Sequence, residues 1–143
     1  MPGFTINEIT VGQSASFSKT ISESDVYLFA GITGDFNPAH VNESYAATTL
    51  FKGRIAHGML SAGLISTVLG TALPGPGTIY LKQDLKFLAP VRIGDTVTAT
   101  CTAKEILPER NRVVFDCLVK NQEGTAVISG EALVMPPQKD KEE

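Results

Sequence analysis

Hydrophobic and polar residues alternate through the second half of the chain, and this alternation predicts β-strands. In Thr96–Ala103, valine, alanine and cysteine occupy every second position, and threonine occupies all of the others. Val113–Lys120 alternates in the same way, and Thr125–Met135 is rich in β-branched residues. A two-residue period is typical of strands with one buried face. A further strand is expected at Thr78–Leu88, so that four strands joined by short turns would form an antiparallel meander.

The first half of the chain changes to helical spacing after an opening strand expected at Ala15–Ile21. Ser22 is followed three residues later by Asp25, which is the pattern of a capping box at the start of a helix. Apolar residues then recur at helical spacing as far as Gly34, a residue type common just after the end of a helix. A helix is therefore predicted between Ser22 and Gly34.

A second helix is predicted from His57 to about Leu69, and it is apolar on nearly all sides. Glycine, alanine and serine keep one of its flanks narrow. A helix without a polar face must be buried. The apolar surfaces of one helix and of an antiparallel sheet are both buried when the sheet curls around the helix, so an α+β domain is predicted.

Composition and charge narrow the class of protein. The chain has 143 residues, of which 43% are hydrophobic, and its net charge is −3 with 12 Lys+Arg. This length suits one domain, and this charge gives no indication of a nucleic-acid-binding surface. Two cysteines are too few for a disulfide framework, and neither a signal peptide nor a membrane-spanning run is recognisable. A cytoplasmic protein without a membrane partner is expected, with residues 1–135 forming the domain and 136–143 a disordered tail.

The segment between the two helices, Gly34–His40, combines an acid and an imidazole. Asp35 and His40 are five residues apart, and Pro38 restricts Asn37 to extended geometry. A rigid, non-helical bend is expected, and it would aim both side chains at one point. A carboxylate and a histidine that share one water are a suitable general acid/base pair. The alternative is that Asp35 only caps the following turn and that His40 is an ordinary half-buried histidine. Taken alone, the spacing favours this structural interpretation.

Gly58 stands at the start of the buried helix, where exposed amide groups stabilise negative charge. Without a Cβ atom, this residue would let a ligand approach the backbone and serve as an oxyanion donor. The alternative is that Gly58 only permits close packing. His57 is interpreted as a structural histidine at the helix start rather than as a second acid/base group.

Metal and thiol chemistry are not expected. Asp35, His40 and His57 would supply two imidazoles and a carboxylate, but they lack the tight spacing of metal ligands. Cys101 and Cys117 lie on alternating strand faces and have no sequence neighbour that would lower the pKa of either thiol, so they are interpreted as small core residues.

Several segments together form a recognisable pattern, namely Ala30–His40 (AGITGDFNPAH), Val41–Phe51 (VNESYAATTLF) and Ile55–Leu60 (IAHGML). They resemble the hydratase-2 signature of the MaoC-like, (R)-specific enoyl-CoA hydratases. Leu73–Leu81 (LPGPGTIYL) and Phe87–Asp95 (FLAPVRIGD) resemble the same family in the same order, and the resemblance spans roughly residues 10–135. It implies a hot-dog fold, in which an antiparallel sheet wraps around one long helix, and a homodimer with two active sites near the interface.

The resemblance also implies roles for particular residues. Asp35 and His40 match the catalytic acid/base pair, and Gly58 matches the backbone donor to the thioester oxygen. Ser66 matches a supporting hydroxyl near the acid, and Asn37 shapes the loop. The implied reaction is the reversible hydration of a trans-2-enoyl thioester to an (R)-3-hydroxyacyl thioester, without a cofactor. The expected substrate is an acyl-CoA, with acyl-carrier protein as the alternative carrier.

Two other functions stay open on the same fold. An acyl-thioester hydrolase would need water aimed at the carbonyl carbon, whereas the Asp35/His40 motif favours attack at the β-carbon. A non-catalytic acyl-CoA-binding module would use the same pocket, and retention of every catalytic position argues against it. Release of free thiol would indicate the hydrolase, and tight binding without turnover would indicate the binding module.

Overall fold

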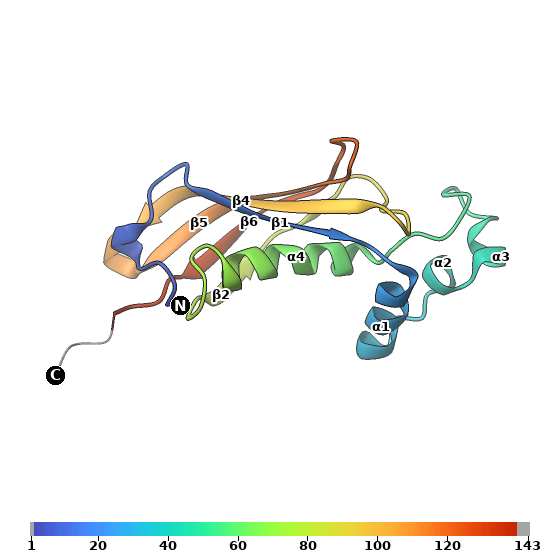
Figure 1. Cartoon of the computed structure of the whole chain (residues 1–143), viewed down its shortest axis with the longest axis horizontal. Coiled ribbons are helices and arrows are strands. Elements are labelled where there is room, and N and C mark those ends of the chain that lie inside the picture. Colours follow the sequence, from blue (N-terminus) through green and yellow to red (C-terminus); the bar gives the residue numbers. More distant parts are fainter. Residues whose placement is uncertain (1, 140–143) are drawn as a thin grey trace.

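An antiparallel sheet packs across one long helix in the computed structural model, which describes residues 2–139. The strand order is β1-β4-β5-β6-β2, and the short strand β3 pairs with β6. Helices α1, α2 and α3 gather at one end of the sheet, while α4 runs along its face (Figure 1). The strands are β1 (Ser14–Thr20), β2 (Ile79–Gln83), β3 (Lys86–Phe87), β4 (Thr96–Leu107), β5 (Arg112–Lys120) and β6 (Ala126–Met135). The helices are α1 (Glu23–Thr33), α2 (Pro38–Val41), α3 (Glu43–Ala46) and α4 (Gly58–Thr71), with 3-10 turns η1 (Ile6–Glu8) and η2 (Pro108–Arg110).

The core lies between α4 and the central strands of the sheet. Along β4 as far as Ala103, and along β5, every second residue is buried, as the alternation predicts. Phe115 on β5 is fully buried and stands in register between Ala103 on β4 and Ala132 on β6. The large ring thus occupies the space that its two small neighbours leave beneath α4. The predicted α+β architecture with one buried helix is present.

Local signals set the ends of α1. Ser22 Oγ accepts a hydrogen bond from the Asp25 amide, and an Asp25 carboxylate oxygen accepts one from the Ser22 amide, which completes the predicted capping box. Gly34 follows the helix with φ +82°, a left-handed conformation that suits glycine. This turn directs the chain out of α1 and into the segment that carries Asp35.

The strand expected at Thr78–Leu88 is interrupted in the structure. It forms β2 and β3, which are separated by Asp84 and Leu85. The cause lies on β6, where Glu131 N donates to the Asp84 carboxylate and a Cβ on Gly130 would overlap the Asp84 carbonyl oxygen. Only glycine lets the backbone approach this closely.

The expected four-strand meander is wrong in one respect. Strands β4, β5 and β6 form a meander, but β2 lies beside β6 rather than beside β4. The reason is the connection between β3 and β4, which crosses the start of α4 instead of turning tightly. There Val91 O accepts from Ala56 N, and Ile55 forms an isolated bridge with Arg92.

The chain leaves β6 without further regular structure as far as residue 139. Residues 136–139 form no helix or strand, although Asn111 Nδ2 donates to Pro136 O at 2.9 Å. The rest of the expected disordered tail, 140–143, lies outside the described residues.

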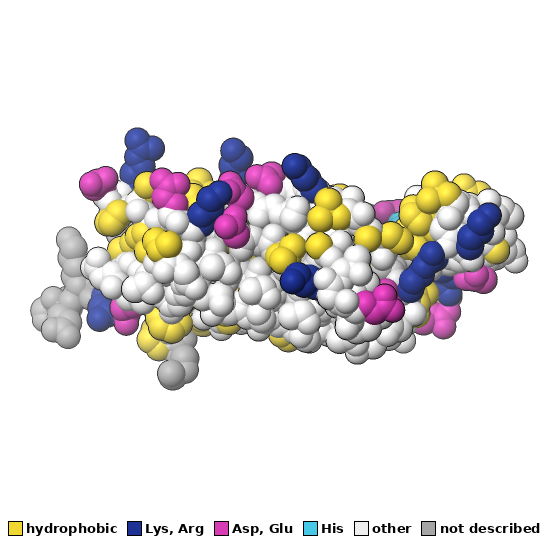
Figure 2. Space-filling model, turned by 90° about the horizontal axis from the view of Figure 1, so that it is seen from above, with side chains coloured by type: hydrophobic (Ala, Val, Ile, Leu, Met, Phe, Trp, Pro, Cys, Tyr) yellow, Lys and Arg dark blue, Asp and Glu magenta, His cyan; other side chains and the backbone are white. Residues whose placement is uncertain are grey.

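None of the helices in residues 2–139 is long and apolar enough to cross a membrane. On the sheet face turned away from α4, basic and acidic side chains are interspersed (Figure 2).

Candidate active site

The loop after α1 is built by side chains that cap their own backbone. Asp35 Oδ1 accepts from Asn37 N at 3.2 Å, and Asn37 Oδ1 accepts from Ala39 N at 3.0 Å. The expected non-helical bend is wrong, because Pro38 begins the one-turn helix α2 and His40 lies within it. Asparagine is a favoured N-cap, and proline suits the first helical position because its missing N–H would have no partner there. The side chains of Asp35 and Asn37 nevertheless brace this loop through their local hydrogen bonds.

His40 is held by a hydrogen bond that defines its tautomer. Its Nδ1 lies 2.7 Å from Ile55 O. Because a carbonyl oxygen only accepts, Nδ1 must carry the proton, and Nε2 of the neutral ring keeps its lone pair. His40 can therefore accept a proton through Nε2 without losing the bond that orients it.

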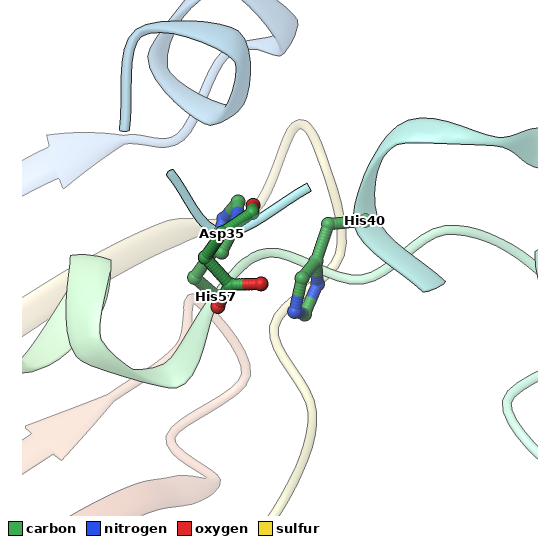
Figure 3. Close-up of side chains that lie close together, drawn as sticks. All are labelled: Asp35, His40 and His57. Carbon is green, nitrogen blue, oxygen red and sulfur yellow. The ribbon is translucent and has the colours of Figure 1, made fainter. Parts of the chain in front are cut away.

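Asp35, His40 and His57 converge on one region (Figure 3). Each offers one ligand atom, and these atoms all lie within 4.8 Å of one another. Two hydrogen bonds in line span more than this distance, so one water can contact both the Asp35 carboxylate and the ring of His40. The structure thus brings together the two residues of the predicted acid/base pair. Asp35 also caps its turn, so the structural and chemical interpretations of this residue are compatible.

The same cluster can be tested as a metal site. The rings of His40 and His57 pack against each other in a tilted stack, with centroids 3.9 Å apart and planes inclined by 31°. A metal ion binds in the plane of an imidazole at about 2.0–2.1 Å. In-plane lone pairs of stacked rings run side by side instead of meeting at one ion. The geometry therefore does not favour a shared metal, and the absence of one stays a prediction.

A cavity of about 400 Å³ opens beside His40. Its volume is within the usual range for small-molecule sites. Four separate parts of the chain line it: α2, the start of α4 with the residues before it, the end of β3 with the segment after it, and β6. Its lining is mostly apolar, with Phe51, Met59, Phe87 and Ile128 among the walls. It suits an apolar chain whose reactive end lies near His40.

Gly58 lines this cavity as the first residue of α4. The first amides of a helix have no acceptor within their own helix, so Gly58 N–H can donate to a ligand. A Cβ here would lie 2.6 Å from Cε1 of Phe87, so close packing also requires glycine. The two interpretations of Gly58, as an amide donor to a ligand and as a residue that permits close packing, are therefore compatible.

The two serines of α4 have different surroundings. Ser66 is exposed and lines a separate hollow with Tyr80 and Leu81. Within a single copy of the chain it therefore does not line the cavity beside His40. Its predicted contact with the acid stays a prediction. Ser61 is fully buried, lines the cavity, and its Oγ has no hydrogen-bond partner among the described residues. Sequence reasoning missed Ser61, although its spacing of three from Gly58 puts both on one helix face.

Arg54 is a second residue that sequence reasoning missed. Its Nε donates to His40 O at 2.6 Å, and its guanidinium also donates to a Glu23 carboxylate oxygen at 2.8 Å. The bond from Arg54 holds the pKa of Glu23 below its usual value. Arg54 thereby joins α2 to α1. No local sequence signal could reveal it, because Glu23 is 31 residues away.

The fold and the site together define a hot-dog domain with an acid–histidine pair at an acyl-sized apolar cavity. The chain belongs to the MaoC-like family, because the sequence profile described as "MaoC like domain" matches residues 7–124. The family resemblance expected from the sequence is confirmed.

Individual relatives agree with this assignment. The chain is 66% identical to the (R)-specific enoyl-CoA hydratase of Rhodospirillum rubrum over 132 residues, which cover 91% of this chain and 90% of the relative. It is 50% identical to the 3-hydroxybutyryl-CoA dehydratase of Methylorubrum extorquens, covering 94% and 85% of the two chains. The solved structure of the R-hydratase PhaJ1 from Pseudomonas aeruginosa superposes with a TM-score of 0.91 at 49% identity, covering 96% of this chain and 88% of that one. The expected hot-dog fold is confirmed.

Proposed function

We propose that this protein is an (R)-specific enoyl-CoA hydratase, a hydro-lyase that interconverts trans-2-enoyl-CoA and (R)-3-hydroxyacyl-CoA. The observation that carries the proposal is the arrangement of Asp35 and His40. A carboxylate oxygen of Asp35 and a ring nitrogen of His40 lie within 4.8 Å of each other, beside an apolar cavity, and the bond from Nδ1 to Ile55 O leaves the Nε2 lone pair of His40 free. The names of the relatives in Rhodospirillum rubrum and Methylorubrum extorquens support the same reaction.

The geometry suits addition of water to a conjugated double bond. Asp35 and His40 hold one water between them, and the pair removes a proton as the water oxygen bonds to the β-carbon. The π electrons move toward the α-carbon, and negative charge develops on the thioester oxygen, where the Gly58 amide stabilises it. The pair then returns a proton to the α-carbon, so that one water has been added in total. Because the two groups act as a coupled pair, the steps belong to the pair and not to either residue.

The test is the loss of enoyl-thioester absorbance when the protein is mixed with crotonyl-CoA. The expected result is turnover to 3-hydroxybutyryl-CoA of the R configuration, established by chiral analysis of the product. Release of free CoA would instead identify an acyl-thioester hydrolase. Saturable binding without any turnover would identify an acyl-CoA-binding module, and either result would overturn the proposal.

A homodimer is part of this proposal. β2 is an edge strand, and it exposes Ile79, Tyr80 and Leu81, which are 52%, 40% and 43% accessible. Exposed apolar edges invite pairing with another strand. A second copy that pairs along β2 would cover these side chains and the neighbouring hollow that contains Ser66. The cytoplasmic location is proposed as well, and it is supported by Cys101 and Cys117, which are free thiols joined by a hydrogen bond of 3.9 Å between their Sγ atoms.

Leu81→Lys is expected to weaken the dimer, because it places a charge on the apolar edge. Light scattering after gel filtration should change from twice the chain mass of 15.2 kDa to that mass itself. Val11→Lys is the matched control, since Val11 is 66% exposed in the segment between η1 and β1. A wild-type protein of single-chain mass, or a Leu81→Lys variant that stays dimeric, would contradict this interface.

A further inference from the structure

The imidazole of His57 contacts both members of the acid/base pair. The residue is 2% exposed, and its Nε2 lies 2.9 Å from the backbone oxygen of Asp35. One neighbour of its ring is the ring of His40, with centroids 3.9 Å apart. The ring of Phe29 is the other, with centroids 4.7 Å apart at an interplanar angle of 51°. His57 is therefore enclosed between α1 and the catalytic loop.

The hydrogen bond to Asp35 has a fixed direction. A carbonyl oxygen only accepts, so His57 Nε2 must donate. Asp35 is an exposed residue in a turn, and its other hydrogen bonds within residues 2–139 join it to neighbours two positions away, at Thr33 and Asn37. The bond from His57 is the longer-range tie that fixes the backbone of the acid against the helix start.

The contact with His40 restrains the orientation of the His40 ring. The bond from Nδ1 to Ile55 O fixes one edge of the His40 ring. Stacking on His57 restrains the plane of that ring, because turning it would lose the contact between the two faces. The direction of the Nε2 lone pair is thus set by two independent contacts.

We infer that His57 is a positioning residue for the proposed hydration, so this inference rests on the proposed function. His57 is also the N-cap of α4, immediately before Gly58. One residue thereby contacts the backbone of the acid and the ring of the base, and adjoins the amide donor in the chain. Misplacement of reacting groups by about 1 Å can cost 10²-fold in rate. A purely structural histidine would contribute to stability alone.

Two variants separate the two contacts. His57→Gln keeps an amide N–H near the position of Nε2 but loses the stacked ring, and His57→Phe keeps a ring but loses the donor. Each is expected to lower kcat for crotonyl-CoA about 10–100-fold with KM changed by less than about 2-fold, because alignment and not binding is lost. Val68→Ala is the matched control: Val68 is fully buried in α4, so its truncation lowers stability without touching the pair.

A spectroscopic readout tests the position of His40 without turnover. The chain has 2 histidines, so ¹⁵N-histidine labelling of either His57 variant leaves the signals of His40 alone. In His57→Phe and His57→Gln the Nδ1–H resonance of His40 is expected to move or broaden, whereas Val68→Ala should leave it in place. The spectrum of His57→Gln serves if His57→Phe does not fold.

The outcomes distinguish the inference from the function on which it rests. If the wild-type protein does not hydrate crotonyl-CoA, the proposed function fails. If the wild type is active and both His57 variants keep its kcat and its His40 resonance, the positioning role is overturned and His57 is structural. A loss of kcat equal to that of Val68→Ala would lead to the same conclusion.

Discussion

Replacing Asp35 by Asn, or His40 by Asn, is expected to lower kcat/KM for crotonyl-CoA about 10²–10⁴-fold. Both substitutions keep the local structure while removing the chemistry. Asn at position 35 can still accept from Asn37 N, as the carboxylate does. Asn at position 40 carries an N–H close to the position of Nδ1 and can still donate to Ile55 O. What is lost is a group that can take up and return a proton.

The double variant gives a sharper result than either single one. Because both residues act on one water, losing the second should cost far less than losing the first, and the effects should not multiply. Initial rates of absorbance loss measure all three variants against the wild type. Asp116→Asn is the matched control, because the Asp116 side chain is exposed on β5 and should leave the rate unchanged. If Asp35→Asn or His40→Asn kept more than about a third of the wild-type rate, the assigned pair would be wrong.

Phe115→Ala is expected to have the largest effect on stability, lowering the free energy of unfolding by about 3–5 kcal/mol. The ring is fully buried, and its partners in register are Ala103 and Ala132. Truncation would put three alanines side by side across the sheet. None of them can extend into the space beneath α4, so the cavity cannot close by repacking within that row.

Urea unfolding at equilibrium measures this loss, at one fixed protein concentration because a dimer makes stability concentration-dependent. Phe115→Leu fills most of the space and should cost much less. Leu28→Ala is the surface control: Leu28 is 63% exposed, and a change of no more than about 0.5 kcal/mol is expected there. A cost below about 1 kcal/mol for Phe115→Ala would mean that the sheet and α4 can collapse around the gap.

The features predictable from the sequence are those set by local periodicity and local capping. The alternation in Thr96–Ala103 and Val113–Lys120 places β4 and β5, because each strand has one buried face. The capping box of Ser22 and Asp25 places the start of α1. The segment His57–Leu69 is apolar on nearly all sides, and this identifies the one helix that the sheet must cover.

The features that could not be predicted depend on contacts between distant positions. The interruption at Asp84 follows from the close approach of Gly130 on β6, and strands β3, β4 and β5 come between the two residues along the chain. Arg54 joins residues of α1 and α2 through its guanidinium, and no periodicity marks such a residue. The sequence shows His57 only as the first residue of a helix, whereas its side-chain contacts lie on α1, the loop after it and α2.

The cavity exists only in the completed fold, because four separate parts of the chain form its walls. An unfolded or partly assembled chain has no comparable site for an acyl chain. A ligand that binds only the folded state stabilises it by mass action, by about 2.7 kcal/mol at a concentration 100 times its Kd. Supply of acyl thioester and the abundance of folded protein are therefore thermodynamically linked, and scarcity of substrate exposes more of the chain to proteolysis.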